Sequence, residues 1–232
     1  MNRREVIERT TTPRGELQLQ RRGEDYEIVS NGTFLMATHG GESERLLVRA
    51  AVAACARPRR VLIGGLGVGY SLAEAVRVDE AVEIVVVEIE EAVVRWHAGP
   101  LRPWSGGALN DPRVDVVVAD LVRWLDAAHA PFDVICLDVD NGPDWTVTAD
   151  NAALYTPAGL RRLASLVAPG GVLAVWAAAP SPAFAAALNG VFGEVREQLV
   201  DARRGSPDAI YLAADPGERA YADSPRMRRE SA

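Results

Sequence analysis

The sequence predicts an α/β fold: a Rossmann-like, seven-stranded sheet of the methyltransferase type, preceded by a small antiparallel β unit. Three observations indicate this fold. An apolar run at 61–63 leads directly into a glycine-rich turn and then into a helical pattern. From residue 59 onward strand-like and helix-like segments alternate, which predicts a parallel sheet with right-handed crossovers. The last two strand-like segments follow each other without a helix, which is typical of the antiparallel final strand of methyltransferase-like sheets.

The N-terminal segment predicts the antiparallel unit, with about three strands over residues 13–38. Within it, the pair Asn31-Gly32 is a strong signal for a two-residue hairpin turn. After this unit, Ser43 is placed to cap a helix over about 44–56.

The rest of the chain predicts a methyltransferase-like domain over residues 43–215, after a β unit at 1–42. A polar tail at 216–232 is expected to be disordered. A Pro-Gly-Gly turn at 169–171 precedes the fifth strand of the sheet. The expected strands lie at 60–64, 83–88, 114–118, 132–138, 171–177, 194–200 and 208–214. The expected helices lie at 69–77, 90–97, 120–128, 157–167 and 181–190.

Composition argues against several classes of protein. A hydrophobic share of 48% over 232 residues is enough for a sizeable core, and no apolar run approaches the roughly 20 residues of a membrane span. No apolar signal core stands near residue 1, so we expect a cytoplasmic protein without a membrane partner. The net charge of −7 disfavours nucleic-acid binding, and the sequence contains no lysine that could form a Schiff base.

The cysteines and histidines predict neither a disulfide nor a metal site. Cys55 and Cys136 lie in a helical and a strand-like pattern, so we expect both to be small buried hydrophobic residues. The three histidines are far apart in the sequence, and we therefore expect no metal.

The glycine turn and the strand that follows it predict a site for a nucleoside. The turn contains four glycines: Gly64, Gly65, Gly67 and Gly69. Glu88 ends the next strand, where a carboxylate can hold two ribose hydroxyls, and Ile89 stands beside it. A dinucleotide fingerprint requires glycine where Tyr70 stands; the Gly-x-Gly-x-Gly form is commoner in enzymes that use S-adenosylmethionine, where no pyrophosphate sits on the helix N-terminus. The alternative is a tight strand–helix turn without a ligand.

Further acids follow the third and fourth strands, and the carboxyl ends of parallel strands meet at one edge of a sheet. Asp120 is expected near the adenine amino group, with Leu121 packing on the ring. Its alternative role is that of a loop acid or a helix N-cap.

The loop after the fourth strand, Asp-Val-Asp-Asn-Gly-Pro at 138–143, is the second strong motif. A carboxylate there could orient an amine nucleophile and accept its proton, so Asp138 is the expected catalytic residue, with Asp140 and Asn141 next. The alternative is a turn in which these side chains satisfy their own backbone. Trp145 could wall an acceptor pocket and stack on a cation, whereas core packing is the favoured role for Trp176.

Over about residues 13–200 the chain resembles the polyamine synthases, the spermidine synthase type of aminopropyltransferase, in a divergent bacterial subgroup with the Asp-Val-Asp-Asn-Gly-Pro loop. The resemblance rests on the hairpin unit, Gly64-Gly65, Glu88, Asp120, the loop at 138–143, Leu154-Tyr155 and Pro169-Gly-Gly.

The resemblance implies transfer of an aminopropyl group from decarboxylated S-adenosylmethionine to the amine of a small molecule, by an enzyme that forms dimers or tetramers. It also implies roles for single residues. Glu88 corresponds to the acid that binds ribose and Asp120 to the acid on the adenine side. Asp138 corresponds to the catalytic aspartate, and Tyr155 to a substrate-binding position.

The chain departs from the family pattern at four positions that handle cations. Gly67 replaces the aspartate that holds the donor's ammonium, and Asn141 replaces the second loop aspartate. Leu35 and Ser43 stand where a glutamine and a tyrosine line the polyamine groove. Each lost charged hydrogen bond removes roughly 1.5 to 3 kcal/mol of binding energy, which Asp140 could restore in part.

These departures leave three functions open. The first is aminopropyl transfer to a polyamine. The second is methyl or aminocarboxypropyl transfer from intact S-adenosylmethionine, because Gly67 removes the charge that would repel the carboxylate of that donor. The third is a non-catalytic protein that binds an adenosyl ligand.

Overall fold

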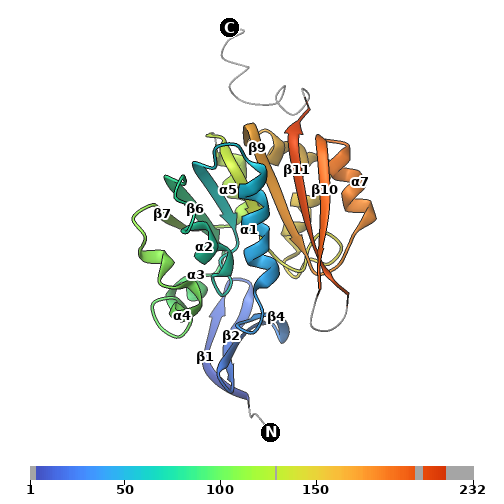
Figure 1. The fold of residues 1–232 in the computed structure, drawn as a ribbon. Helices are drawn as coiled ribbons and strands as arrows, with labels where there is room; N and C mark the ends of the chain where they lie inside the picture. Colours follow the sequence, from blue (N-terminus) through green and yellow to red (C-terminus); the bar gives the residue numbers. More distant parts are fainter. Residues whose placement is uncertain (1–3, 129, 202–205, 218–232) are drawn as a thin grey trace.

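The computed structural model describes residues 4–128, 130–201 and 206–217, which form two sheets joined by a long helix (Figure 1). The small sheet is antiparallel, with the strand order β1-β2-β3-β4. Its strands are β1 (Arg4–Thr12), β2 (Gly15–Arg22), β3 (Asp25–Ser30) and β4 (Thr33–Ala37).

The small sheet has one strand more than the sequence predicts. The missed strand, β1, is exposed or half-buried along its whole length. Because it has no buried face, its sequence does not need the alternation of polar and apolar residues by which a strand is predicted. It is an edge strand, held by its pairing with β2. The predicted hairpin is confirmed between β3 and β4: Asn31 and Gly32 have φ angles of 48° and 78°, as a tight hairpin turn requires.

The large sheet confirms the predicted methyltransferase-type topology, with the strand order β10-β11-β9-β8-β5-β6-β7. β11 is antiparallel to both of its neighbours, and the neighbouring pairs from β9 to β7 are parallel. The strands are β5 (Arg60–Gly64), β6 (Glu83–Glu88), β7 (Val114–Val118), β8 (Phe132–Leu137), β9 (Val167–Ala177), β10 (Phe192–Val200) and β11 (Asp208–Pro216).

Two predicted boundaries in this domain are wrong. The Pro-Gly-Gly segment at 169–171 lies inside β9, because β9 begins at Val167 and its register to β8 shifts between Phe132 and Val134. Ser43 does not cap the first helix, which begins one residue earlier, after Gly41 with a φ of 83°. The predicted disordered tail lies outside the described residues except for 216 and 217, and the first of these ends β11.

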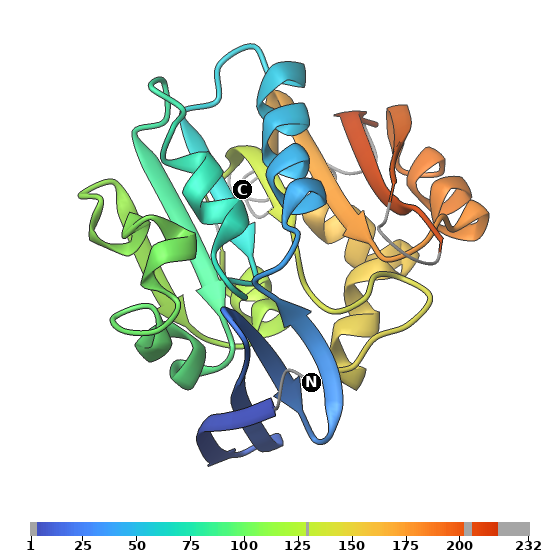
Figure 2. The ribbon, with the colours of Figure 1, turned by 60° about the horizontal axis from the view of Figure 1, so that its bottom comes forward.

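Helices cover both faces of the large sheet (Figure 2). The α-helices are α1 (Glu42–Ala54), α2 (Tyr70–Ala75), α3 (Glu91–Trp96), α4 (Arg102–Ser105), α5 (Leu121–Ala127), α6 (Pro157–Ala164) and α7 (Pro182–Asn189). Two 3-10 helices are η1 (Ala108–Asn110) and η2 (Ala149–Tyr155). None of the helices in the described ranges is long and apolar enough to cross a membrane.

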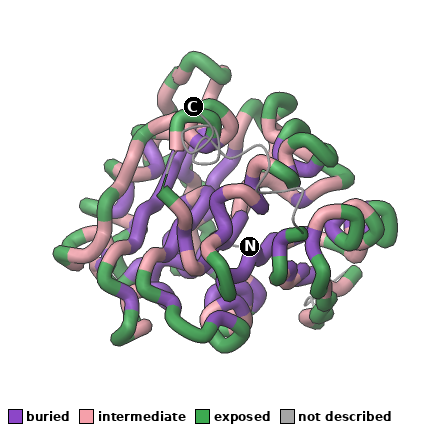
Figure 3. Tube along the Cα trace, turned by 90° about the horizontal axis from the view of Figure 1, so that it is seen from above, coloured by how far each residue is buried: buried purple, intermediate pink, exposed green. Residues whose placement is uncertain are grey.

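The central strands β5, β6 and β8 are buried on both faces, as expected for a parallel sheet between two helical layers, whereas β7 and β10 at the edges are largely half-buried or exposed (Figure 3). In β5, Val61 and Ile63 pack with α1, α2 and the small sheet, whereas Leu62 packs with α5, α6 and α7. The small sheet joins the first of these cores through residues such as Leu17 and Ile28. Cys55 and Cys136 are free and buried, as predicted.

Candidate active site

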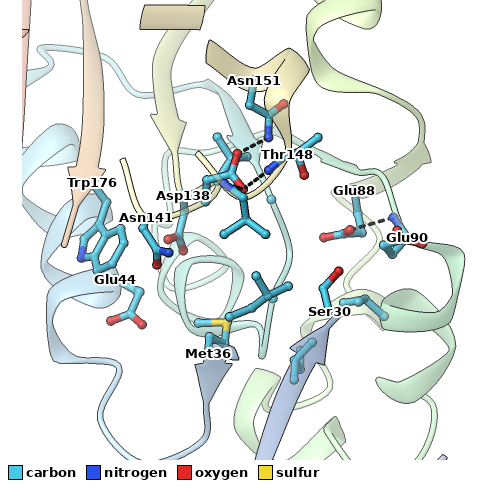
Figure 4. Close-up of a pocket in the computed structure, with 18 of the residues that line it drawn as sticks. Ser30, Met36, Glu44, Glu88, Glu90, Asp138, Asn141, Thr148, Asn151 and Trp176 are labelled. Atoms are coloured by element: carbon cyan, nitrogen blue, oxygen red, sulfur yellow. Dashed lines mark hydrogen bonds between the residues drawn. The ribbon is translucent and has the colours of Figure 1, made fainter. Parts of the chain in front are cut away.

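A cavity of about 1190 Å³ lies where the small sheet meets the carboxyl ends of β5, β6 and β8. Its walls come from the glycine turn, the ends of β6 and β8, α1 and the strands of the small sheet (Figure 4). Ten residues of the predicted site line it: Leu35, Ser43, Gly65, Gly67, Glu88, Ile89, Leu121, Asp138, Asp140 and Asn141.

The glycine turn is pressed against the loop that follows β8. Gly65 has a φ of 90°, and a Cβ added there would stand 2.2 Å from the backbone oxygen of Asp138. The Asp138 amide in turn donates to the Gly64 carbonyl oxygen at 2.8 Å. Gly64 and Gly69 do not line the cavity; added Cβ atoms there would meet Leu121 and His97. Only the middle of the turn, Gly65 and Gly67, therefore faces the cavity.

Met36, which sequence reasoning missed, fills the space above Gly67. A Cβ added to Gly67 would stand 2.2 Å from the Met36 sulfur, and that sulfur accepts a hydrogen bond from the Val68 amide at 3.1 Å. The Met36 side chain, from β4, thus occupies the space that a side chain at position 67 would need.

Glu88 is held at the end of β6 by two backbone amides. Its Oε2 accepts from the Leu66 amide at 2.9 Å and its Oε1 from the Glu90 amide at 2.8 Å. Burial raises the pKa of Glu88, and these two hydrogen bonds oppose that shift. Each carboxylate oxygen has a second lone pair, so Glu88 can still accept from a diol.

Arg14 lies at the same end of the cavity as Glu88 and is a second residue that sequence reasoning missed. Its Nε donates to Glu90 at 2.7 Å and its Nη2 to the Ile89 carbonyl oxygen at 2.7 Å. Asp120 lies beside a separate pocket of about 350 Å³, where it accepts from the Arg123 amide and caps α5. Its alternative role as an N-cap is therefore confirmed, while Leu121 faces the main cavity.

Asp138 directly follows β8 and is half-buried at the other end of the cavity. Ser71 in α2 donates to its Oδ2 at 2.7 Å. Burial raises the pKa of Asp138 to about 7; the charges of Glu44 and Asp208 act in the same direction, and the Ser71 hydrogen bond opposes them. A carboxylate that titrates near neutral pH suits proton transfer.

Asp140 closes the loop, and both of its carboxylate oxygens accept hydrogen bonds from residues that follow it in the chain. Its Oδ1 accepts from the amides of Val147 and Thr148, both at 3.1 Å, and its Oδ2 accepts from the Asn151 side chain. This residue also has a left-handed φ of 55°. Oδ1 thus supports the loop backbone, as the alternative interpretation of the motif predicts, whereas Oδ2 links the loop to the Asn151 side chain.

The expected acceptor residues separate into two groups. Asn141 lies between Asp138 and Trp176 at the cavity, and its Nδ2 is buried without a hydrogen-bond partner among the described residues (Figure 4). Trp145 is 61% exposed and does not line the cavity, whereas Trp176 does. Tyr155 lies beneath the loop, where its hydroxyl donates to the Val139 carbonyl oxygen at 3.2 Å.

Two further carboxylates, Glu44 in α1 and Asp208 at the start of β11, reach the cavity from segments distant in the sequence. Ser43 donates to Glu44 at 2.9 Å. Burial raises the pKa of both acids. No local motif marks either residue, and a charge in the first turn of a helix ordinarily indicates only a favourable helix dipole.

Fold and cavity together define a protein with a methyltransferase-like fold and a cavity lined by carboxylates. Residues 42–184 match the family model of the spermine/spermidine synthase domain. The chain therefore belongs to the spermine/spermidine synthase family.

Curated relatives support this assignment. The chain is 33% identical over 169 residues to a polyamine aminopropyltransferase of Mycobacterium tuberculosis, covering 71% of this chain and 31% of the relative. It is 34% identical to polyamine aminopropyltransferase 2 of Pseudomonas aeruginosa, with coverages of 65% and 44%. Polyamine aminopropyltransferase 1 of Hyperthermus butylicus is 32% identical, with coverages of 78% and 62%. The aligned part of the chain thus spans between about a third and three fifths of these relatives.

Solved structures share the fold. A crystal structure of spermidine synthase in complex with the transition-state analogue AdoDATO has a TM-score of 0.75 and 16% identity, covering 97% of this chain and 87% of that one. Spermidine synthase from Thermotoga maritima has a TM-score of 0.74 and 19% identity, with coverages of 97% and 77%.

The contact at Gly65 yields a stability prediction. Gly65→Ala should lower the free energy of unfolding by at least about 2 kcal/mol, because left-handed strain adds to a collision with the Asp138 backbone. Gly170→Ala is the matched control, since Gly170 also has a positive φ of 75° but no atom within 4 Å of an added Cβ. Urea unfolding measures both, and equal losses would contradict the proposed contact.

The assignment of Asp140 to loop closure is tested by Asp140→Ala. We expect a loss of about 1 to 3 kcal/mol of stability, because three donors lose their acceptor, together with faster proteolysis within residues 141–151. Asp144→Ala, an exposed acid of the same loop, should change stability by less than about 0.5 kcal/mol. Equal losses of stability in the two variants would contradict the role of Asp140 in holding the loop closed.

Proposed function

We propose that this protein transfers an aminopropyl group from decarboxylated S-adenosylmethionine to the nitrogen of a small amine, as the names of its relatives suggest. The observation that carries the proposal is the polarity of the cavity. Glu88, which can accept hydrogen bonds from ribose hydroxyls, lies at one end of the cavity. Asp138, which can accept a proton, lies across from it beside the glycine turn (Figure 4).

In the proposed reaction the acceptor nitrogen attacks the carbon next to the donor's sulfonium. A carbon–nitrogen bond forms, the carbon–sulfur bond breaks, and the electron pair of the broken bond leaves with the neutral thioether. Because the sulfonium is a good leaving group, the protein mainly aligns nitrogen, carbon and sulfur. Asp138 accepts the proton that the amine loses, and Ser71 orients the Asp138 carboxylate.

Transfer from intact S-adenosylmethionine is the second candidate, favoured by the uncharged Gly67. Incubation of the protein with each donor and a panel of small amines, followed by mass spectrometry, separates the candidates by the group added. Aminopropyl products support the proposal, and methyl or aminocarboxypropyl products support the second candidate. Donor binding without any product would leave a non-catalytic role.

Asp138→Asn should lower turnover by about 100-fold or more, because an amide cannot accept the amine proton. Binding of the thioether by-product, measured by calorimetry, should stay nearly unchanged. Asp144→Asn removes the same charge from an exposed position of the same loop and should keep wild-type turnover. Turnover by Asp138→Asn at the wild-type rate would remove Asp138 from the mechanism.

The rate should fall as the pH decreases through about 7, because protonated Asp138 cannot act as a base. The groups around it are Ser71 in α2, Glu44 in α1 and Asp208 in β11. Ser71→Ala removes a hydrogen bond that stabilises the carboxylate, so its acid limb should move to higher pH. The ratio of wild-type to variant rates cancels titration of the amine substrate, and a ratio independent of pH would contradict this role of Asp138.

A further inference from the structure

Three carboxylates from three separate elements converge at the end of the cavity across from Glu88. They are Asp138 after β8, Glu44 in the first turn of α1 and Asp208 at the start of β11. In Figure 4, Glu44, Asp138, Asn141 and Trp176 lie on one side and Glu88 on the other. The cavity thus has a hydroxyl-binding end and a strongly acidic end.

No guanidinium pairs with this acidic end among the described residues that line the cavity, and the one imidazole that lines it, His39, is exposed. Those residues carry eight carboxylates and a single guanidinium, and that guanidinium, of Arg14, is bound to Glu90 near Glu88. Arg45, next to Glu44 in α1, instead stacks over the Tyr70 ring at 4.1 Å and donates to the Gly41 carbonyl oxygen. An opposite charge close to a partly buried carboxylate favours its ionised form, so a bound cation would stabilise this end of the cavity.

The backbone of Glu44 lies against the helix that the glycine turn opens. The Ser71 hydroxyl, which donates to Asp138, also lies 3.4 Å from the Glu44 carbonyl oxygen. Ser71 belongs to α2, the helix that the glycine turn opens. The turn itself provides no charge, because Gly67 has no side chain and the Met36 sulfur fills the space above it.

We propose that Glu44, together with Asp208, binds the ammonium group of the donor's three-carbon tail. As a result the protein discriminates against a donor whose tail also bears a carboxylate. This inference rests on the proposed function, because it presumes an adenosyl sulfonium in the cavity. The charge that position 67 lacks is supplied by α1 and β11. Intact S-adenosylmethionine would bring its carboxylate among three others and be repelled.

The test is calorimetric binding of three ligands that differ in the tail: decarboxylated S-adenosylmethionine, the intact donor, and methylthioadenosine, whose tail is uncharged. Wild-type protein should prefer the decarboxylated donor. Glu44→Gln should weaken binding of that donor by about 10- to 100-fold, as expected for one charged hydrogen bond. It should leave the affinity for methylthioadenosine nearly unchanged and reduce the preference over the intact donor. Asp208→Asn should act in the same direction with a smaller effect.

Glu80→Gln, an exposed acid away from the cavity, is the control and should bind all three ligands like the wild type. An unchanged donor ratio in both Glu44→Gln and Asp208→Asn would overturn the inference, as would equal loss of all three ligands. A change confined to the KM of the amine would also overturn it, since Glu44 would then bind the acceptor. Wild-type protein that binds none of the three ligands would instead refute the proposed function itself.

Discussion

The close contact between the glycine turn and the loop after β8 is the constraint on which the site depends. A side chain at Gly65 would collide with the Asp138 backbone, and the hydrogen bond from the Asp138 amide to Gly64 continues the pairing of β5 with β8 past the ends of the strands. The turn and the loop are therefore fixed relative to each other by backbone atoms. The glycine turn therefore stays beside the Asp138 carboxylate.

The electrostatics of the acidic end favour the binding of a cation. Burial raises the pKa of Glu44, Asp138 and Asp208, so each carboxylate is more costly to ionise in the empty cavity than in water. Their mutual repulsion adds to that cost for Asp138. A bound ammonium relieves both effects at once, and the free energy released on relief contributes to binding. The acidic end is thus pre-arranged for a cation and unsuited to a neutral or anionic group.

The sequence predicts those parts of the fold and site that local patterns determine. The strands β5 to β8, the turn at Gly65, and the positions of Glu88 and Asp138 follow from apolar runs that end in glycine or in an acid. The strand β1 is missed because its residues other than Val6 and Ile7 are polar and show no alternation. Arg14, Met36, Glu44 and Asp208 are missed because tertiary packing, and no local motif, brings them to the cavity. For Asp120 and Asp140, the sequence could not decide between a ligand contact and a backbone contact.

The two ends of the cavity differ in how far they depend on the segment that matches the family model. Glu88 and Asp138 both lie within residues 42–184, as does the whole glycine turn. Met36, which excludes a side chain at position 67, lies before that segment, and Asp208 lies after it. The acidic end therefore combines two residues of the family segment, Glu44 and Asp138, with two residues from outside it, Met36 and Asp208. The contact between turn and loop lies wholly within the family segment.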